Sequence, residues 1–232
     1  MTIVLFDIDG TLIRTGRAGS RAMDRAFEEL FGIPKAFDGI QMAGRTDKWI
    51  LEDAAARSGV SLTAERFQRF RVRYSECLLE ALPHPGPQKG ILPGVRSLLD
   101  ALAGPQMRDD VFLALLTGNC ETGARIKLEY FDLWRYFRCG AYGDDVHDRN
   151  DLFSVAMSRV QACGGPAVRP RDVIVVGDTP LDVACAAAAG ARSVAVATGP
   201  SNSETLSRSG ADVVFDDLSD TSAFLRLVGA IV

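Results

Sequence analysis

Short runs of apolar residues recur along the chain and alternate with helical patterns. The runs are continuous and rich in β-branched and aromatic residues, which is typical of strands buried on both faces. They lie at 3–6, 111–116, 173–176, 193–197 and 213–215. Helical periodicity separates them at 94–103, 121–131, 149–161 and 181–189. Strand–helix alternation predicts an α/β fold, a doubly wound parallel sheet with helices on both faces.

A long segment without any strand pattern separates the first two predicted strands. Helical periodicity predicts three helices in it, at 20–31, 46–58 and 63–82. The following stretch, 83–94, is rich in proline and glycine and predicts a linker. We therefore predict two domains. The α/β core comprises residues 1–14 and 90–232, and a small inserted α-helical cap domain comprises residues 15–89.

Composition and charge narrow the class of protein. An apolar fraction of 47% and a charged fraction of 24% are ordinary for a globular chain. The net charge of −4 argues against a nucleic-acid partner. The N-terminal apolar run is too short for a signal peptide, and no stretch approaches the roughly 18 apolar residues of a membrane span. Five scattered cysteines indicate a reducing compartment. We expect a cytoplasmic protein without a membrane partner, either a monomer or a weak homodimer.

Polar motifs follow three of the predicted strands directly. They are DIDGTL at 7–12, TGN at 117–119 and GDTPLD at 177–182. Each motif alone also suits a turn or a helix N-cap. The carboxyl ends of parallel strands meet at one edge of a sheet, so four carboxylates would converge there and repel one another. The pattern therefore predicts a divalent metal ion such as Mg²⁺ and a basic side chain beside it.

These motifs, in this order and with a helical insertion after the first strand, resemble the haloacid dehalogenase superfamily of phosphotransferases. The resemblance covers the whole chain, and the insertion resembles the C1-type helical cap of that family. The chain looks most like the phosphoglycolate phosphatase and β-phosphoglucomutase-like branch. The resemblance implies a Mg²⁺-dependent phosphatase acting on a small phosphorylated metabolite, with a phosphoglycolate-like compound as the first candidate. A phosphomutase and a non-catalytic binding scaffold are the alternatives.

The resemblance also implies roles for single residues. Asp7 is the nucleophile that forms an aspartyl-phosphate, and Asp9 is the general acid and base. Asp7, Asp178 and the backbone carbonyl of Asp9 hold the metal ion, with Asp182 as an outer or second ligand. Thr117 and Arg149 complete the catalytic set. Phosphate and substrate contacts are expected from Gly10, Thr11, Thr117, Gly118, Asn119 and Arg149.

The third motif of the family is a basic residue, usually lysine, that precedes the last of these strands. The only lysine between Asn119 and Asp178 is Lys127, which lies in the middle of a predicted helix and does not suit that role. Arg149 matches the position better, because Asp148 can cap the helix that it begins. An arginine would bind phosphate through two parallel hydrogen bonds. A surface arginine in a charged loop is the alternative.

The cap is expected to select the substrate. Arg45, in the GRTD segment at 44–47, begins a predicted cap helix and could reach an anionic group of the substrate. An arginine exposed to water is the alternative for this position. We expect the cap to open and close about 13–19 and 83–94 and so to exclude water during the reaction.

Overall fold

A six-stranded parallel sheet forms the centre of the computed structural model, which describes residues 1–229. The strand order is β5-β4-β1-β6-β7-β8, and every neighbouring pair is parallel. The strands are β1 (Thr2–Phe6), β4 (Val111–Leu116), β5 (Gly140–Ala141), β6 (Val173–Gly177), β7 (Arg192–Val196) and β8 (Val213–Phe215). The predicted α/β class and parallel sheet are confirmed. β5 was not predicted, because two residues carry no periodicity.

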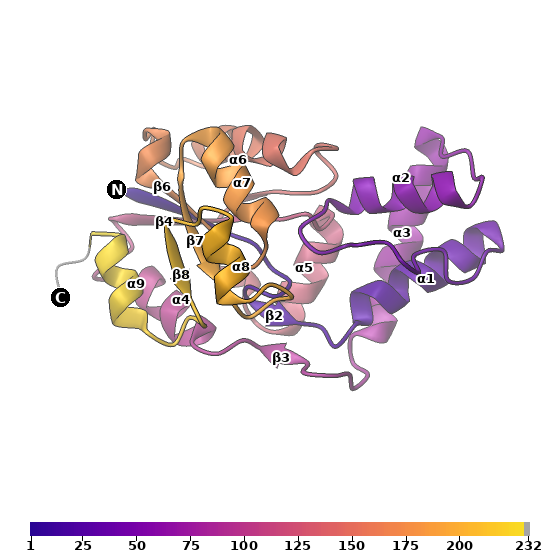
Figure 1. Cartoon of the computed structure of the whole chain (residues 1–232), viewed down its shortest axis with the longest axis horizontal. Helices are drawn as coiled ribbons and strands as arrows, with labels where there is room; N and C mark the ends of the chain where they lie inside the picture. The colour runs from indigo at the N-terminus through magenta and orange to yellow at the C-terminus, as the bar shows by residue number, and fades with distance from the viewer. Residues whose placement is uncertain (230–232) are drawn as a thin grey trace.

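Helices cover both faces of this sheet (Figure 1). Val4 and Phe6 of β1 pack on one face, and Ile3 and Leu5 pack on the other, because successive side chains of a strand point to opposite sides. The first face is covered by α4 (Val95–Ala103), α5 (Glu121–Tyr130) and α9 (Thr221–Leu227). The second is covered by α6 (Leu152–Ala162) and α7 (Pro180–Ala189), while α8 (Ser203–Arg208) packs beside β7. Burial on both faces explains why the strands read as continuous apolar runs.

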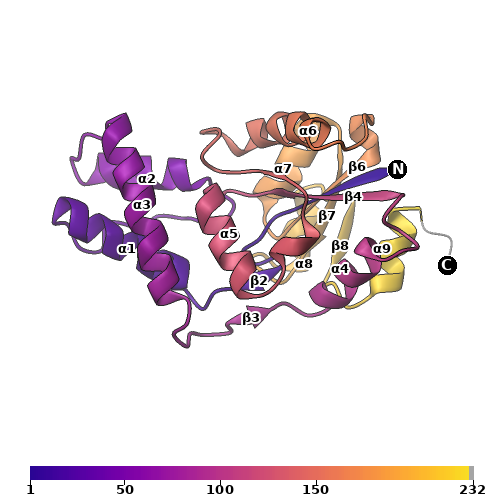
Figure 2. The ribbon, with the colours of Figure 1, turned by 180° about the vertical axis from the view of Figure 1, so that it is seen from behind.

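Three helices form a separate body beyond the carboxyl ends of the strands (Figures 1 and 2). They are α1 (Ala18–Phe31), α2 (Asp47–Arg57) and α3 (Ala64–Ala81). They share their own hydrophobic cluster, in which Phe27 and Phe70 pack edge to face. Among the described residues, Cys120 is the one buried member of this cluster that comes from outside residues 15–89. No strand occurs within 15–89, and we refer to this three-helix body as the cap, while the bounds of the two domains stay a prediction.

The two chain connections between core and cap run side by side. Ile13–Arg14, which form β2, pair antiparallel with Gly90–Ile91, which form β3. Both strands are too short to be visible in the sequence pattern. They tie together the two segments at which the sequence predicts a hinge.

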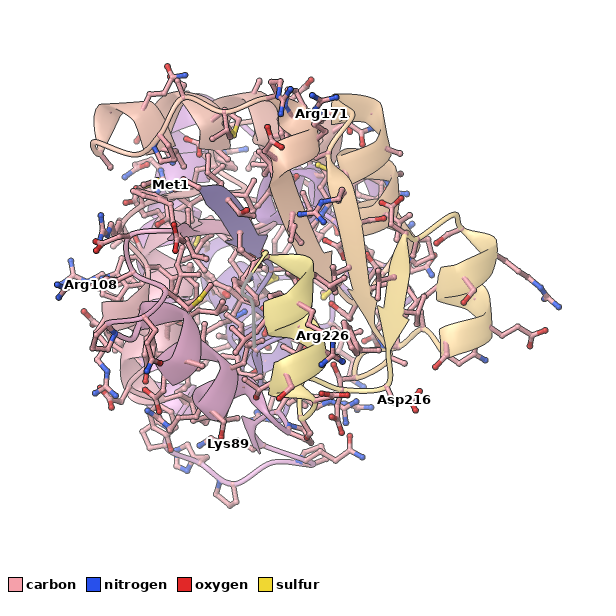
Figure 3. The ribbon with its side chains drawn as sticks, turned by 90° about the vertical axis from the view of Figure 1, so that its left-hand side faces the viewer. Met1, Lys89, Arg108, Arg171, Asp216 and Arg226 are labelled. Atoms are coloured by element: carbon pink, nitrogen blue, oxygen red, sulfur yellow. The ribbon has the colours of Figure 1, made fainter. Side chains whose placement is uncertain are left out.

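The end of the core opposite the cap carries no part of this junction. Figure 3 views the molecule from that end, with Met1 just before β1, Arg108 and Arg171 at the periphery and Arg226 nearer the centre of the view. The polar motifs all lie at the other edge of the sheet. No helix among the described residues is both long and apolar enough to cross a membrane.

Candidate active site

A tight turn after β1 separates the two aspartates of the first motif. The backbone N–H of Asp7 donates to the carbonyl of Val176 on β6 at 2.9 Å, which continues the sheet for one more residue. The chain then folds back, and the N–H of Leu12 donates to the carbonyl of Ile8. Gly10 takes a φ of 83°, and a Cβ there would collide with the carboxylate of Asp178. The turn therefore buries Asp7 and leaves the side chain of Asp9 on another side of the site, 41% exposed.

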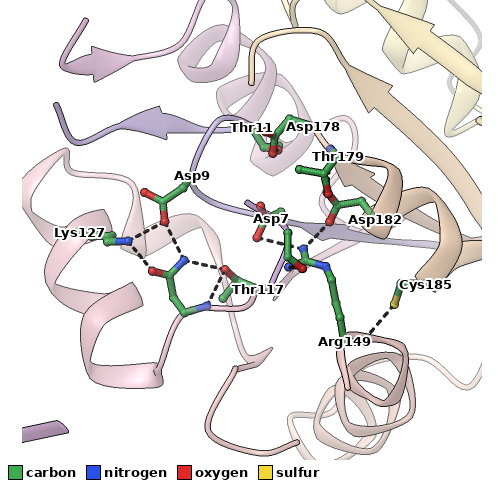
Figure 4. Close-up of polar contacts among 12 residues, drawn as sticks. Asp7, Asp9, Thr11, Thr117, Lys127, Arg149, Asp178, Thr179, Asp182 and Cys185 are labelled. Atoms are coloured by element: carbon green, nitrogen blue, oxygen red, sulfur yellow. Dashed lines mark hydrogen bonds and ion pairs between the residues drawn. The ribbon is translucent and has the colours of Figure 1, made fainter. Parts of the chain in front are cut away.

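Two further carboxylates are held at the end of β6. Asp178 accepts a hydrogen bond from the hydroxyl of Thr11 at 3.1 Å. Asp182, in the first turn of α7, accepts from the N–H of Thr179 at 3.0 Å and from its hydroxyl at 2.7 Å, which makes a capping box. One carboxylate oxygen each from Asp7, Asp178 and Asp182 lie within 4.8 Å of one another (Figure 4).

Burial changes the protonation of this acidic cluster. It raises the pKa of Asp7 to about 6, with the neighbouring charges of Asp182 and Asp9 adding to the effect and Arg149 opposing it. Burial likewise raises the pKa of Asp178 well above its ordinary range, with Asp182 and Asp7 contributing. Crowded hard oxygen donors with too little positive charge around them fit a Mg²⁺ ion. The side chain of Asp9 does not belong to this cluster.

Arg149 points into the site. It begins a 3₁₀ turn (Arg149–Asp151), and the carboxylate of Asp148 caps that turn by accepting the N–H of Asn150 at 2.9 Å. Only 5% of Arg149 is exposed. Its Nη2 lies 3.3 Å from Oδ1 of Asp7 and also contacts Oδ1 of Asp182 (Figure 4). The alternative of a surface arginine is therefore wrong, and the guanidinium supplies positive charge beside Asp7.

A second polar network surrounds Asp9. The side-chain amide of Asn119 donates to Oδ2 of Asp9 at 2.9 Å and to the hydroxyl of Thr117, also at 2.9 Å. The ammonium of Lys127 donates to the same Asp9 oxygen at 2.6 Å and to Oδ1 of Asn119. The two aspartates of the first motif thus have separate cations, Arg149 for Asp7 and Lys127 for Asp9.

Lys127 is the residue of the site that sequence reasoning set aside. It does not contact Asp7, but it is 96% buried, on α5, and pairs with Asp9. The sequence did contain a pattern that indicates a buried position for Lys127. Ala124 and Leu128 form the apolar face of the same helix, and a lysine on a buried face needs an anionic or polar partner.

The cap closes over this edge of the sheet and leaves a cavity of about 400 Å³ between the two bodies. Asp7, Asp9, Asp178, Lys127 and Arg149 line its core side. Arg45 lines its cap side as an exposed residue, with its guanidinium 4.3 Å from the centre of the Trp49 ring. The position suits the predicted substrate contact, whose role stays a prediction.

Backbone contacts join cap and core beside the cavity. The N–H of Asp47 donates to the carbonyl of Gly118 at 2.7 Å, and the hydroxyl of Thr46 donates to the carbonyl of His147 at 3.0 Å. Nη1 of Arg149 also donates, to the carbonyl of Gly44 on the cap side at 3.2 Å. A Cβ on Gly118 would overlap the carbonyl oxygen of Arg45. Gly118 therefore permits close approach of the cap.

Enlarging residue 118 is expected to weaken cap closure. Gly118→Ala introduces a clash between the new Cβ and the backbone carbonyl of Arg45. Overpacking of this kind destabilises the packed state by about 1–3 kcal/mol. We expect a larger radius of gyration by small-angle X-ray scattering and faster proteolysis within 83–94. Gly90→Ala is the matched control, because a Cβ at residue 90 meets nothing within 4 Å. Scattering curves of Gly118→Ala and the wild type that superimpose would contradict the expectation.

A model of the haloacid dehalogenase-like hydrolase family matches residues 4–196. The chain belongs to this family. A phosphoglycolate phosphatase from Chromobacterium violaceum is 27% identical over 224 residues, covering 94% of this chain and 93% of the relative. The crystal structure of a hydrolase from Pseudomonas syringae aligns with a TM-score of 0.69 at 25% identity, covering 99% of this chain and 100% of that one.

A solved structure of lower sequence identity shares the fold. The crystal structure of CbbY from Rhodobacter sphaeroides in complex with phosphate aligns with a TM-score of 0.68, covering 95% of this chain and 96% of that one at 19% identity. At that identity the likeness shows the fold alone. Together these comparisons confirm the predicted resemblance to haloacid dehalogenase-like hydrolases.

Proposed function

We propose that this haloacid dehalogenase-like hydrolase is a Mg²⁺-dependent phosphatase of a small phosphorylated metabolite, with phosphoglycolate as the first candidate substrate. The observation that carries the proposal is that the two aspartates of the first motif have different surroundings. Asp7 is buried in an acidic cluster beside Arg149, and Asp9 is held apart by Lys127 and Asn119. The relatives named phosphoglycolate phosphatase support the choice of substrate.

The reaction needs one group that attacks and one that moves protons. A carboxylate oxygen of Asp7 attacks phosphorus, and the bond from phosphorus to the ester oxygen breaks. Asp9 gives its proton to the departing ester oxygen, so that an alcohol leaves. Asp9 then takes a proton from a water molecule, whose oxygen attacks phosphorus and releases inorganic phosphate with Asp7 restored.

Positive charge and hydrogen-bond donors hold the phosphate during these steps. Arg149 lies beside Asp7, and its buried Nε–H has no partner among the described residues, which leaves a donor for an anion. When bound by Asp7, Asp178 and the backbone carbonyl of Asp9, Mg²⁺ would neutralise charge on the phosphate. The oxygens of Asp182 are engaged by Thr179 and Arg149, so we assign it to orienting Arg149 and to an outer contact with the ion.

Phosphate release from a panel of phosphorylated metabolites and an aryl phosphate, with Mg²⁺ and with a chelator, tests the proposal. We expect release that depends on Mg²⁺ and is fastest with phosphoglycolate. Release that persists in chelator would contradict the role of the ion. Mg²⁺ binding without release from any compound would favour a phosphomutase, and neither binding nor release would favour a non-catalytic scaffold.

Mg²⁺ binding is expected to weaken as the pH falls. The ion binds deprotonated carboxylates, and the pKa of Asp7 is raised to about 6 while that of Asp178 is raised well above its ordinary range. Each proton that the ion displaces weakens apparent affinity about tenfold per pH unit below the pKa of the group. Calorimetric titrations in buffers of different ionisation enthalpy should show proton release near neutral pH. An affinity that is constant from about pH 5 to pH 7 would contradict this expectation.

A further inference from the structure

A buried hydroxyl without a partner faces the cavity from the cap. Tyr74 of α3 is 2% exposed and lines the cavity, and its Oη has no hydrogen-bond partner among the described residues. Its ring stacks on that of Phe70, with the centroids 6.1 Å apart and the planes 4° from parallel, which fixes its position. Burying a hydroxyl is unfavourable unless it is hydrogen-bonded. The Oη of Tyr74 is therefore available to form a hydrogen bond with a ligand in the cavity.

The ammonium of Lys127 has a donor to spare beside the same space. It carries three N–H groups, and its hydrogen bonds within the described chain go to Asp9 and Asn119. The ammonium of Lys127 and the hydroxyl of Tyr74 both lie close to Gly19 of α1. A Cβ built on it would lie 3.5 Å from Nζ of Lys127 and 3.8 Å from Oη of Tyr74, with no clash. Both donors therefore lie beside Gly19, which has no side chain to fill the space next to them.

The position of this space relative to the reaction follows from Asp9. The ammonium of Lys127 is 2.6 Å from Oδ2 of Asp9. In the proposed reaction the ester oxygen of the substrate must lie within about 2.6–3.2 Å of the carboxylate of Asp9. Lys127 and the ester oxygen are therefore neighbours of one carboxylate. An oxygen carried by the next carbon of the leaving group is the substituent that can reach Lys127 while the ester oxygen stays at Asp9.

We propose that Tyr74 and Lys127 form a second subsite, which binds an oxygen on the carbon next to the phosphorylated carbon of the substrate. The inference rests on the proposed phosphatase function and narrows its substrate class. The carboxylate of phosphoglycolate and the hydroxyl of 2-hydroxyethyl phosphate both supply such an oxygen, whereas ethyl phosphate does not. Both donors are fixed before the substrate arrives, Tyr74 by stacking and Lys127 by its two hydrogen bonds.

Removing the hydroxyl of Tyr74 tests the subsite. The readout is selectivity, the kcat/KM of each oxygen-bearing compound divided by that of ethyl phosphate. Loss of one hydrogen bond to substrate predicts that Tyr74→Phe lowers this ratio about tenfold or more. The compound whose ratio falls identifies the oxygen as carboxylate or hydroxyl. Tyr142→Phe is the matched control, because Tyr142 is a buried tyrosine that does not line the cavity, and it should leave the ratio unchanged.

Filling the space gives an independent test. Gly19→Ala places a methyl group in van der Waals contact with both donors and so narrows the space from which an oxygen can reach them. Alanine also favours the helical conformation of α1. We expect a melting temperature equal to or above that of the wild type together with a lower selectivity ratio. Ratios that remain at the wild-type value in both Tyr74→Phe and Gly19→Ala would overturn the subsite. Absence of Mg²⁺-dependent release from every compound of the panel by the wild type would reject the proposed function, and the subsite with it.

Discussion

Replacing Asp7 with asparagine is expected to abolish turnover and, in the absence of Mg²⁺, to stabilise the protein. An amide cannot form the phosphoryl intermediate, so kcat should fall by at least about 10⁴-fold. The stability gain has a separate cause. The pKa of Asp7 is raised from 3.8 to about 6 by burial, so the fold disfavours its ionised form. Above about pH 6 that carboxylate therefore lowers the free energy of unfolding, by about 1–3 kcal/mol at neutral pH.

The direction of the stability change distinguishes this electrostatic effect from a general destabilisation of the fold by the substitution. Asp7→Asn should unfold at a higher temperature than the wild type in chelator, and the difference should shrink as the pH falls from about 6 to about 4. Asp109→Asn is a suitable control, since the side chain of Asp109 is 87% exposed and should affect neither rate nor stability. A variant with near wild-type rate would exclude Asp7 as the nucleophile. A lower melting temperature in chelator would contradict the electrostatic account.

Replacing Arg149 with methionine is expected to have the largest structural cost in the site. The guanidinium is 5% exposed and pairs with Asp7 and Asp182, so its removal leaves buried carboxylates without their cation. Breaking a buried pair in this way costs about 3–5 kcal/mol. The loss of a phosphate-binding charge should also lower kcat/KM by about 10²-fold or more. Arg149→Lys keeps the charge but not the two-pronged geometry, and should lie between the wild type and Arg149→Met.

Two comparisons make the Arg149 result interpretable. Arg169→Met removes an arginine that is 65% exposed and paired with Asp172, and a surface pair contributes at most about 1 kcal/mol. Mg²⁺ should recover part of the stability of Arg149→Met, because another cation then offsets the carboxylates. Equal denaturation midpoints for Arg149→Met and Arg169→Met would show that Arg149 does not balance the acidic cluster.

The sequence allowed the sheet and the three motif positions to be predicted for a physical reason. Strands buried on both faces, such as β1 and β6, must be apolar throughout. The end of each strand can therefore be recognised in the sequence, because an aspartate follows the apolar run. Residues at such ends necessarily share one edge of the sheet. The short strands β2, β3 and β5 escaped prediction, because two residues carry no pattern and their pairing depends on distant segments.

The hydrogen-bond and ion-pair partners within the site could not be predicted in the same way. Spacing alone does not show that the turn at Gly10 directs Asp7 and Asp9 to different partners. Lys127 reaches Asp9 only because the fold brings α5 and the turn after β1 together, a contact across 118 positions of sequence. Tyr74 reads as one more apolar position of a cap helix, and only the folded chain shows that its hydroxyl lacks a partner.

Trapping the phosphoryl group on the enzyme tests most directly whether Asp7 is the nucleophile. Wild-type protein would be mixed with substrate and Mg²⁺, quenched in acid within the first turnover and analysed by peptide mass spectrometry. We expect the peptide containing Asp7 to gain one phosphoryl group, and we expect this gain to disappear in chelator. Turnover with no phosphoryl group on that peptide, or with the group on another residue, would contradict this expectation.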